Sequence, residues 1–217
     1  MVNDPRKIDL VIWDWNGTLL DDTATCYQIA NEMRVERGMP PMPGIDYYRS
    51  VFGFPVIEYY RRMGYTFEAE PFESISYEFH VMYAERLSSC PLQPCATDIL
   101  KTVRERGARQ VLLSATGQKL LNDQVGFFSL AGYFDRVIGN SDNFAHGKAE
   151  YAKEFLLDSG VLPKRALFVG DTDHDFEIAD TLGCNCALLV PGHQTREHLS
   201  ALGARLIDSL CEVPALL

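Results

Sequence analysis

The sequence predicts an α/β protein whose core is a doubly wound parallel sheet, with an α-helical cap domain inserted into it. Short apolar runs alternate with helix-like segments over the second half of the chain. This alternation is typical of a parallel sheet that is covered by helices on both faces. A further apolar run near the N-terminus is separated from the others by residues 21–94, whose pattern is helical.

Five apolar runs predict the strands of the sheet. In chain order they are Ile8–Trp13, Gln110–Leu113, Arg136–Ile138, Ala166–Val169 and Ala187–Val190. The helices expected around the later strands are Ala96–Arg106, Gln118–Leu130, Ala149–Ser159, Asp175–Leu182 and Thr195–Leu202. Ligands of such sheets bind beyond the carboxyl ends of the strands, so polar residues at those ends are the first candidates for a site.

Residues 21–94 interrupt the alternation and are too long for a structureless loop in a compact domain. Proline and glycine residues divide them into four expected helices: Thr23–Arg37, Ile45–Val51, Pro55–Met63 and Glu73–Ser88. We therefore expect a core domain formed by residues 1–20 and 95–217 and a helical cap domain formed by residues 21–94. Because the insertion leaves from the carboxyl end of the first strand, the cap should lie over the site and open and close.

Composition limits the possible partners. The 217 residues carry a net charge of −10, which argues against binding to nucleic acid or to an anionic membrane. A small anionic substrate, such as a phosphorylated metabolite, remains possible if the site supplies its own cations. The sequence has neither an apolar run long enough for a membrane span nor a signal peptide, so a cytoplasmic protein is expected. The pattern leaves open whether it is a monomer or a homodimer.

The six cysteines follow no zinc-binding or C-x-x-C spacing. We therefore expect reduced, partly buried thiols. Binding of a soft metal by Cys184 and Cys186 is a minor alternative.

Four polar elements end the predicted strands or begin the helices after them. Asp14, with Asn16, Gly17 and Thr18, follows the first strand, and Ser114 follows the second. The other two are Lys148 and the segment Gly170-Asp-Thr-Asp-His-Asp175. In a parallel sheet all four would meet at one edge, where they would supply carboxylates, a hydroxyl and an ammonium group. Three aspartates within five residues after an apolar strand are costly without a cation, which indicates a metal site.

These elements resemble the four ordered motifs of the haloacid dehalogenase-like (HAD) superfamily, and the resemblance covers nearly the whole chain. It is strongest to the phosphoglycolate phosphatase and β-phosphoglucomutase-like branch, whose members carry a helical cap between the first two motifs. Within the expected cap, Arg49-Ser-Val-Phe-Gly-Phe-Pro55 is similar to a segment of the phosphatase members. Tyr133-Phe-Asp135 also resembles the family's approach to the third strand.

The resemblance implies Mg²⁺-dependent hydrolysis of a small phosphomonoester, such as phosphoglycolate or a sugar phosphate. Asp14 would attack phosphorus and form an aspartyl-phosphate. Asp14, the backbone carbonyl of Asn16 and Asp171 would hold the Mg²⁺ ion, which prefers oxygen ligands, and Asp175 would either bind the ion directly or support its ligands. Lys148 would stabilise the charge of the transferring group.

The resemblance also implies the residues that bind substrate. Gly17, Thr18, Ser114 and Ala115 would surround the phosphoryl oxygens together with Lys148. Arg49 could bind the distal end of an anionic substrate or pair with a glutamate of the cap, and the sequence leaves both possibilities open.

The position of Asn16 departs from the family, because phosphatases normally carry a second aspartate there. That aspartate protonates the leaving oxygen and then activates water, which an amide cannot do. General acid–base help is typically worth ~10²–10⁴-fold. The chain could therefore be slow, could prefer good leaving groups such as acyl phosphates, could use another group such as His174, or could carry an engineered substitution. A non-catalytic protein that binds a phosphorylated metabolite is the competing hypothesis.

Two related groups of enzymes also lack that aspartate, but this sequence does not meet their other requirements. Phosphonoacetaldehyde hydrolases share an Asp-Trp-x-Gly-Thr motif but need a lysine in the cap, and this sequence has no lysine between Lys7 and Lys101. The true haloacid dehalogenases lack the acidic fourth motif, so Asp171 and Asp175 argue against that activity.

Overall fold

The computed structural model describes residues 7–140 and 148–217. Six strands form a single parallel sheet in the order β3-β2-β1-β4-β5-β6. Their bounds are β1 Leu10–Trp13, β2 Arg109–Gly117, β3 Arg136–Asn140, β4 Ala166–Gly170, β5 Asn185–Leu189 and β6 Arg205–Ile207. The chain builds outward from β1 in one direction and from β4 in the other, so the predicted doubly wound α/β fold is confirmed.

Helices cover both faces of the sheet. They are α5 Ala96–Glu105, α6 Gln118–Phe127, α7 Lys148–Ser159, α8 Asp173–Leu182 and the short α9 Arg196–Ala201. Side chains of β1 alternate between two buried clusters: Val11 and Trp13 pack with α5 and α6, and Leu10 and Ile12 pack with α7 and α8. Burial on both faces explains why this strand is a continuous apolar run.

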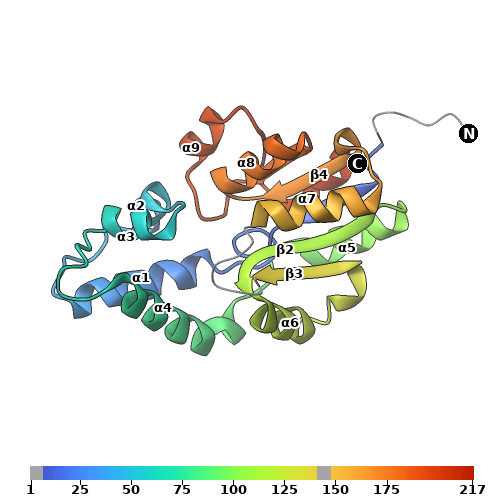
Figure 1. Cartoon of the computed structure of the whole chain (residues 1–217). Coiled ribbons are helices and arrows are strands. Elements are labelled where there is room, and N and C mark those ends of the chain that lie inside the picture. Colours follow the sequence, from blue (N-terminus) through green and yellow to red (C-terminus); the bar gives the residue numbers. More distant parts are fainter. Residues whose placement is uncertain (1–6, 141–147) are drawn as a thin grey trace, which may run out of the picture.

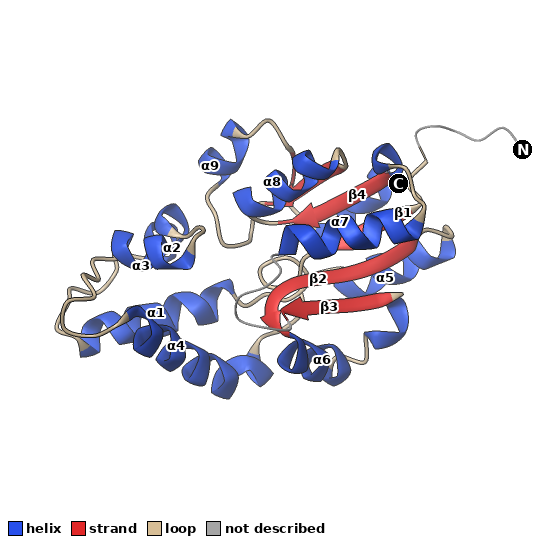
Figure 2. Ribbon diagram, viewed as in Figure 1, coloured by secondary structure: helices blue, strands red, loops and turns tan. Residues whose placement is uncertain are grey.

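Residues 21–94, here called the inserted segment, contain helices and loops but no strand (Figure 2). Its helices are α1 Thr23–Glu36, α2 Ile45–Val51, α3 Val56–Arg62 and α4 Phe72–Arg86. They pack around their own cluster of tyrosine, methionine and other apolar side chains. The inserted segment lies beyond the arrowheads of the strands, and therefore at their carboxyl ends (Figure 1).

The two chain connections between the inserted segment and the core run side by side. The amide of Asp21 donates to the carbonyl of Pro91, and the amide of Gln93 donates to the carbonyl of Leu19, both at 2.9 Å. Leu20 and Leu92 form an antiparallel bridge at the same place. The chain thus passes between the core and the inserted segment at one paired crossing.

Three observations differ from the sequence-based expectations. Strand β2 continues past Leu113 through Ser114 to Gly117, with an irregular register against β3, so Ser114 lies inside the strand. Strand β6 and the 3₁₀ segment Leu210–Leu216 were not predicted. A disulfide joins Cys95, before α5, to Cys211. The expectation of six reduced thiols is therefore wrong for this pair, which is 116 residues apart in sequence.

The remaining cysteines are free; Cys26 and Cys90 are buried, while Cys184 and Cys186 are half-buried. Over the described residues, no group of three or more possible metal ligands includes Cys184 or Cys186. A search of the same residues also finds no helix with the length and hydropathy that a membrane crossing requires. The residues directly before Lys148, at the start of the third motif, lie outside the described part of the chain.

Candidate active site

Asp14 and Lys148 form the centre of a buried cluster at the carboxyl ends of β1 and β4. The Lys148 ammonium group donates to one carboxylate oxygen of Asp14 and, at 2.6 Å, to Asp175. The Thr18 hydroxyl lies between Asp14 and Asp171, at 3.3 Å and 3.1 Å from their oxygens. The strand order reverses between β1 and β4, where open α/β sheets bind their ligands.

Three carboxylates meet in this cluster. Ligand oxygens of Asp14, Asp171 and Asp175 all lie within 4.8 Å of one another. Burial raises the pKa of Asp14 to about 6 and that of Asp171 to about 8. Burial also acts to raise the pKa of Asp175, but the ammonium group of Lys148 outweighs it and lowers that pKa. One lysine therefore leaves the three carboxylates incompletely neutralised, and an all-oxygen set of ligands fits a hard divalent cation such as Mg²⁺.

Two glycines allow the backbone to approach Asp171 closely. A Cβ atom placed on either Gly17 or Gly192 would lie 2.3 Å from Oδ2 of Asp171, which is closer than any real contact. Gly17 also has a φ of +71°, in the left-handed region that favours glycine. The amide of His193 donates to the same oxygen at 2.7 Å, so the carboxylate is held from the side of β5.

Asp175 also belongs to a helix cap. Thr172 is the N-cap of α8, and its amide and hydroxyl donate to Asp175 Oδ2 at 3.1 Å and 2.8 Å. This capping box explains why Thr172 and Asp175 are three residues apart. It fixes one oxygen of Asp175 and leaves the other to accept from Lys148.

The Asn16 side chain is held on both sides by hydrogen bonds. Its amide nitrogen donates to Asp22 and to the Tyr83 hydroxyl, both at 2.8 Å. Its oxygen accepts from the hydroxyls of Thr116 at 2.8 Å and Ser114 at 3.4 Å. Ser114, expected to face a phosphoryl group, thus contacts Asn16 in this structure, although it also lines the adjoining cavity, as does the exposed Ala115.

A buried network that the sequence did not reveal lies next to Asn16. Asp22 accepts from the Gly17 amide at 2.8 Å and from the Tyr83 hydroxyl at 2.7 Å. His193 Nε2 lies 3.2 Å from Asp22, and His193 Nδ1 lies 2.8 Å from the Tyr48 hydroxyl. A second acidic residue soon after the first motif, and a histidine just beyond β5, are the sequence signals that could have pointed to Asp22 and His193.

In this network Asp22 and His193 each stabilise the charged form of the other. Burial alone would raise the pKa of Asp22, but His193 and the surrounding donors outweigh it and lower the pKa to about 2. Burial alone would lower the pKa of His193, but Asp22 raises it to about 8. The pair links the inserted segment to the loop after β5.

Arg49 lies away from the cluster. Its guanidinium group donates to the backbone carbonyls of Gly192 at 2.9 Å and Pro191 at 3.0 Å, and Asp46 lies 3.6 Å away. It therefore contacts the loop after β5, and no glutamate of the inserted segment contacts it among the bonds of the described residues.

A cavity of about 240 Å³ lies between the sheet edge and the inserted segment. The core contributes Asp14, Asn16, Ser114, Lys148, Asp171 and Asp175 to its lining. His174, named above as a possible substitute for the missing acid, is half-buried, lines the cavity and packs against Phe54, with ring centroids 4.7 Å apart. Burial lowers the pKa of His174.

The fold and the site together define an α/β enzyme whose aspartate and lysine centre lies at the switch point of a parallel sheet. Residues 11–189 match the family model described as haloacid dehalogenase-like hydrolase, and the chain belongs to this family. The resemblance inferred from the four motifs is thereby confirmed.

Named relatives agree with the family. The chain is 25% identical over 206 residues to a phosphoglycolate phosphatase of Pseudomonas putida, covering 91% of this chain and 75% of that protein. It is 27% identical over 192 residues to phosphoglycolate phosphatase 1 of Pseudomonas aeruginosa, covering 85% and 70%. A haloacid dehalogenase-like hydrolase of Streptococcus pneumoniae has the same fold, with a TM-score of 0.80 at 20% identity over 96% of this chain and 97% of that one.

Proposed function

We propose that this chain is a Mg²⁺-dependent phosphatase that hydrolyses a small phosphomonoester through an aspartyl-phosphate at Asp14. The observation that carries the proposal is the contact of Lys148 with both Asp14 and Asp175, beside Asp171. A buried carboxylate with a fixed ammonium group and further carboxylates for a metal suits phosphoryl transfer. The names of the relatives make phosphoglycolate the reference substrate, with sugar phosphates beside it.

In the proposed mechanism a carboxylate oxygen of Asp14 attacks phosphorus. The ammonium group of Lys148 stabilises the negative charge on the phosphoryl oxygens, and Gly17, Thr18, Ser114 and Ala115 surround them. Asp14, Asp171, Asp175 and the backbone carbonyl of Asn16 would hold the metal. Bound Mg²⁺ supplies positive charge that reduces repulsion between the carboxylate and the phosphoryl group.

We also propose that residues 21–94 act as a cap. The chain passes between the core and this segment only at the paired crossing of Leu20 and Leu92, about which the segment could open and close once its hydrogen bonds to Asn16, His193 and the loop after β5 are broken. Closure would exclude water from the cavity, which strengthens the interaction of Lys148 with the transferring group.

Phosphate release in the presence of Mg²⁺ tests the proposal. We expect release from at least one member of a panel of alkyl, aryl and acyl phosphates. Asp14→Asn should abolish it, and Lys148→Met should lower kcat about 10²–10³-fold, the usual cost of one charge-stabilising donor. Lys119→Met is the matched control, because the Lys119 side chain is 92% exposed. No release from any substrate with folded protein would refute the proposal.

A slow or non-catalytic protein that binds a phosphorylated metabolite is the second candidate. Asn16 favours it, because both of its amide hydrogen atoms are donated to Asp22 and Tyr83 and no acid occupies this position. Binding of beryllofluoride, a phosphate mimic, with Mg²⁺ separates the two candidates. Tight binding without turnover on the whole panel would favour the binding protein, and turnover would favour the phosphatase.

A further inference from the structure

The wall that the inserted segment contributes to the cavity is aromatic. Its ring side chains include Phe52, Phe54, Tyr59, Tyr60, Phe79 and Tyr83. Edge-to-face and stacked contacts join several of these rings, among them Phe52 with Tyr59 and Phe79 with Tyr83. Rings arranged in this way present apolar faces and edges that favour a further aromatic ring.

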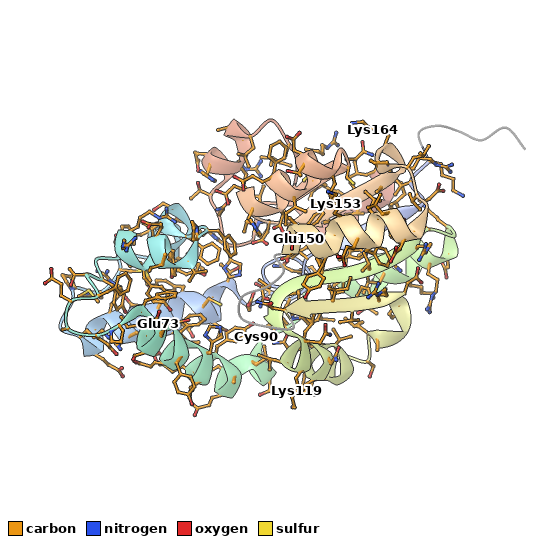
Figure 3. All side chains as sticks on the ribbon, viewed as in Figure 1. Glu73, Cys90, Lys119, Glu150, Lys153 and Lys164 are labelled. Atoms are coloured by element: carbon orange, nitrogen blue, oxygen red, sulfur yellow. A yellow bond between two sulfur atoms is a disulfide. The ribbon has the colours of Figure 1, made fainter. Side chains whose placement is uncertain are left out.

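The same cavity is short of positive charge. Lys148 is the only lysine or arginine that lines it among the described residues, and Asp14 and Asp175 already occupy its ammonium group. Residues 141–147 contain neither lysine nor arginine. Lys119, Lys153 and Lys164, labelled in Figure 3, all belong to the core and not to the inserted segment.

The arginines of the inserted segment that lie nearest in sequence to these rings bind elsewhere. Arg49 donates to the carbonyls of Pro191 and Gly192, and Arg62 donates to the carbonyl of Val51. Arg61 pairs with Glu58, and Arg86 pairs with Glu32. A carboxylate at the distal end of a substrate would therefore enter an acidic cavity in which the described residues offer it no unpaired lysine or arginine, and His193, which also lines the cavity, is already paired with Asp22. Burying such an unpaired charge is strongly unfavourable.

Asn16 restricts which leaving groups can depart efficiently, and this restriction is independent of the cavity wall. Its side chain cannot give a proton to a departing oxygen, so an alkoxide would leave with poor efficiency. A phenolate is far more stable as an anion and needs no proton at the moment of departure. The wall of the cavity and the residue at the first motif thus favour the same kind of substrate.

We propose that the preferred substrate is the phosphate monoester of an uncharged aromatic alcohol of the phenol type, with its ring against the aromatic wall. The proposal rests on the phosphatase function proposed above. Asp14 forms a bond to phosphorus while the bond from phosphorus to the aryl oxygen breaks, and the electron pair leaves with the phenolate, which takes a proton from water. A water molecule then attacks the aspartyl-phosphate, restoring the Asp14 carboxylate and releasing inorganic phosphate and a proton. An apolar cavity of about 150 Å³ accommodates benzene, so the observed space is sufficient for one ring.

Four substrates separate the two causes of the preference. Phenyl phosphate has both an aromatic ring and a good leaving group, benzyl phosphate has only the ring, acetyl phosphate has only the leaving group, and phosphoglycolate has neither. We expect kcat/KM for phenyl phosphate to exceed that for phosphoglycolate by at least about 10²-fold, the lower range of general acid help. Benzyl phosphate and acetyl phosphate should fall between them.

Pocket variants test the role of the wall. Phe79→Ala should lower the ratio of kcat/KM for phenyl phosphate to that for acetyl phosphate by roughly tenfold, about the value of one aromatic contact. Tyr77→Ala on the same helix is the matched control, because Tyr77 is 72% exposed and lies outside the lining. Phe54→Arg adds a cation at a partly exposed position of the wall and should raise kcat/KM for phosphoglycolate relative to phenyl phosphate.

The outcomes are distinguishable. A preference for phosphoglycolate over phenyl phosphate in the unchanged chain would overturn this inference and leave the phosphatase function standing. Absence of turnover on all four substrates would instead remove the phosphatase function itself. If Phe79→Ala does not fold, the ratio measured for Phe54→Arg decides, and an unchanged ratio there would count against the proposed wall.

Discussion

Asn16 is held by partners from both parts of the molecule. Asp22 and Tyr83 accept from its amide nitrogen, and the hydroxyls of Thr116 and Ser114 donate to its oxygen. The residue type therefore matches its surroundings, because an amide can donate and accept at once whereas a carboxylate can only accept. The sequence alone presented Asn16 as a missing acid, and the structure adds that Asp22 is placed to accept from the amide.

We predict that Asn16→Asp alone destabilises the protein at neutral pH. The new carboxylate would replace a donor that lies 2.8 Å from the buried Asp22, so two like charges would meet in a partly buried site. The expected loss in free energy of unfolding is about 1–3 kcal/mol, as for other disrupted buried polar pairs. Adding Asp22→Asn should recover part of this loss, because the exchange restores one donor and one acceptor. Denaturant unfolding of the single and double variants measures both effects.

The double variant also tests the chemistry. With an acid at position 16, kcat/KM for an alkyl phosphate should rise by about 10²-fold or more, while kcat/KM for an aryl phosphate should change little, because kcat/KM reports formation of the aspartyl-phosphate and not its later hydrolysis. Equal rates for the original chain and the double variant on both esters would show that another group protonates the leaving oxygen. A single variant as stable as the original chain would contradict the like-charge argument.

At the scale of elements, the sequence predicted regular helices well and irregular strands poorly. The helix Ile45–Val51 has the expected bounds, and proline and glycine mark the ends of its neighbours. The sequence did not predict that strand β2 extends beyond its apolar run, because the polar residues Ser114 and Thr116 give no apolar pattern. Backbone pairing of β2 with β3 nevertheless resumes at Gly117. Strand β6 has three residues, of which only Ile207 is buried, so it lacks a recognisable alternation.

The residues of the candidate site likewise fall into a group that the sequence could predict and a group that it could not. Asp14, Asp171 and Asp175 could be predicted because they follow strands that apolar runs define, and Lys148 because it begins the helix after the third predicted strand. The partnership of Asp22 with His193 spans 171 residues and depends on how the inserted segment docks, which no local pattern encodes. The contact of Arg49 with the loop after β5 could not be predicted for the same reason.

The loop after β5 offers a test of how closely the elements fit. Gly192→Ala would place a Cβ atom 2.3 Å from Asp171 Oδ2, so the carboxylate or the loop must move. We expect weaker activation by Mg²⁺ and a fall in kcat of about 10²-fold, which is typical of a misplacement near 1 Å. Gly132→Ala is the control, because a Cβ atom added there would meet nothing within 4 Å and the φ of Gly132 is not left-handed. Unchanged Mg²⁺ activation in Gly192→Ala would show that Asp171 does not hold the metal.

At the scale of the whole molecule, the buried carboxylates should make stability depend on pH and metal together. The folded-state pKa of Asp14 is raised to about 6 and that of Asp171 to about 8, above the ordinary value of 3.8. A carboxyl whose pKa rises on folding stabilises the fold while it is protonated, and this contribution is lost as pH increases. His193, whose pKa is raised to about 8, changes stability in the same direction, and the lowered pKa values of Asp22 and Asp175 act only in the acid range below the ordinary carboxyl value.

We therefore predict that the metal-free protein loses stability between about pH 5 and about pH 8, and that added Mg²⁺ opposes the loss. The ion binds the ionised carboxylates, so its effect must grow as the protons leave. At saturating Mg²⁺ the melting temperature should rise by about 5–10 °C near pH 8 and by much less near pH 5. Thermal unfolding with Mg²⁺ or with a chelator measures the difference, and Asp171→Asn should remove most of it. A Mg²⁺ effect that is equal at both pH values, or larger in acid, would mean that the ion binds outside the Asp14–Asp171–Asp175 cluster.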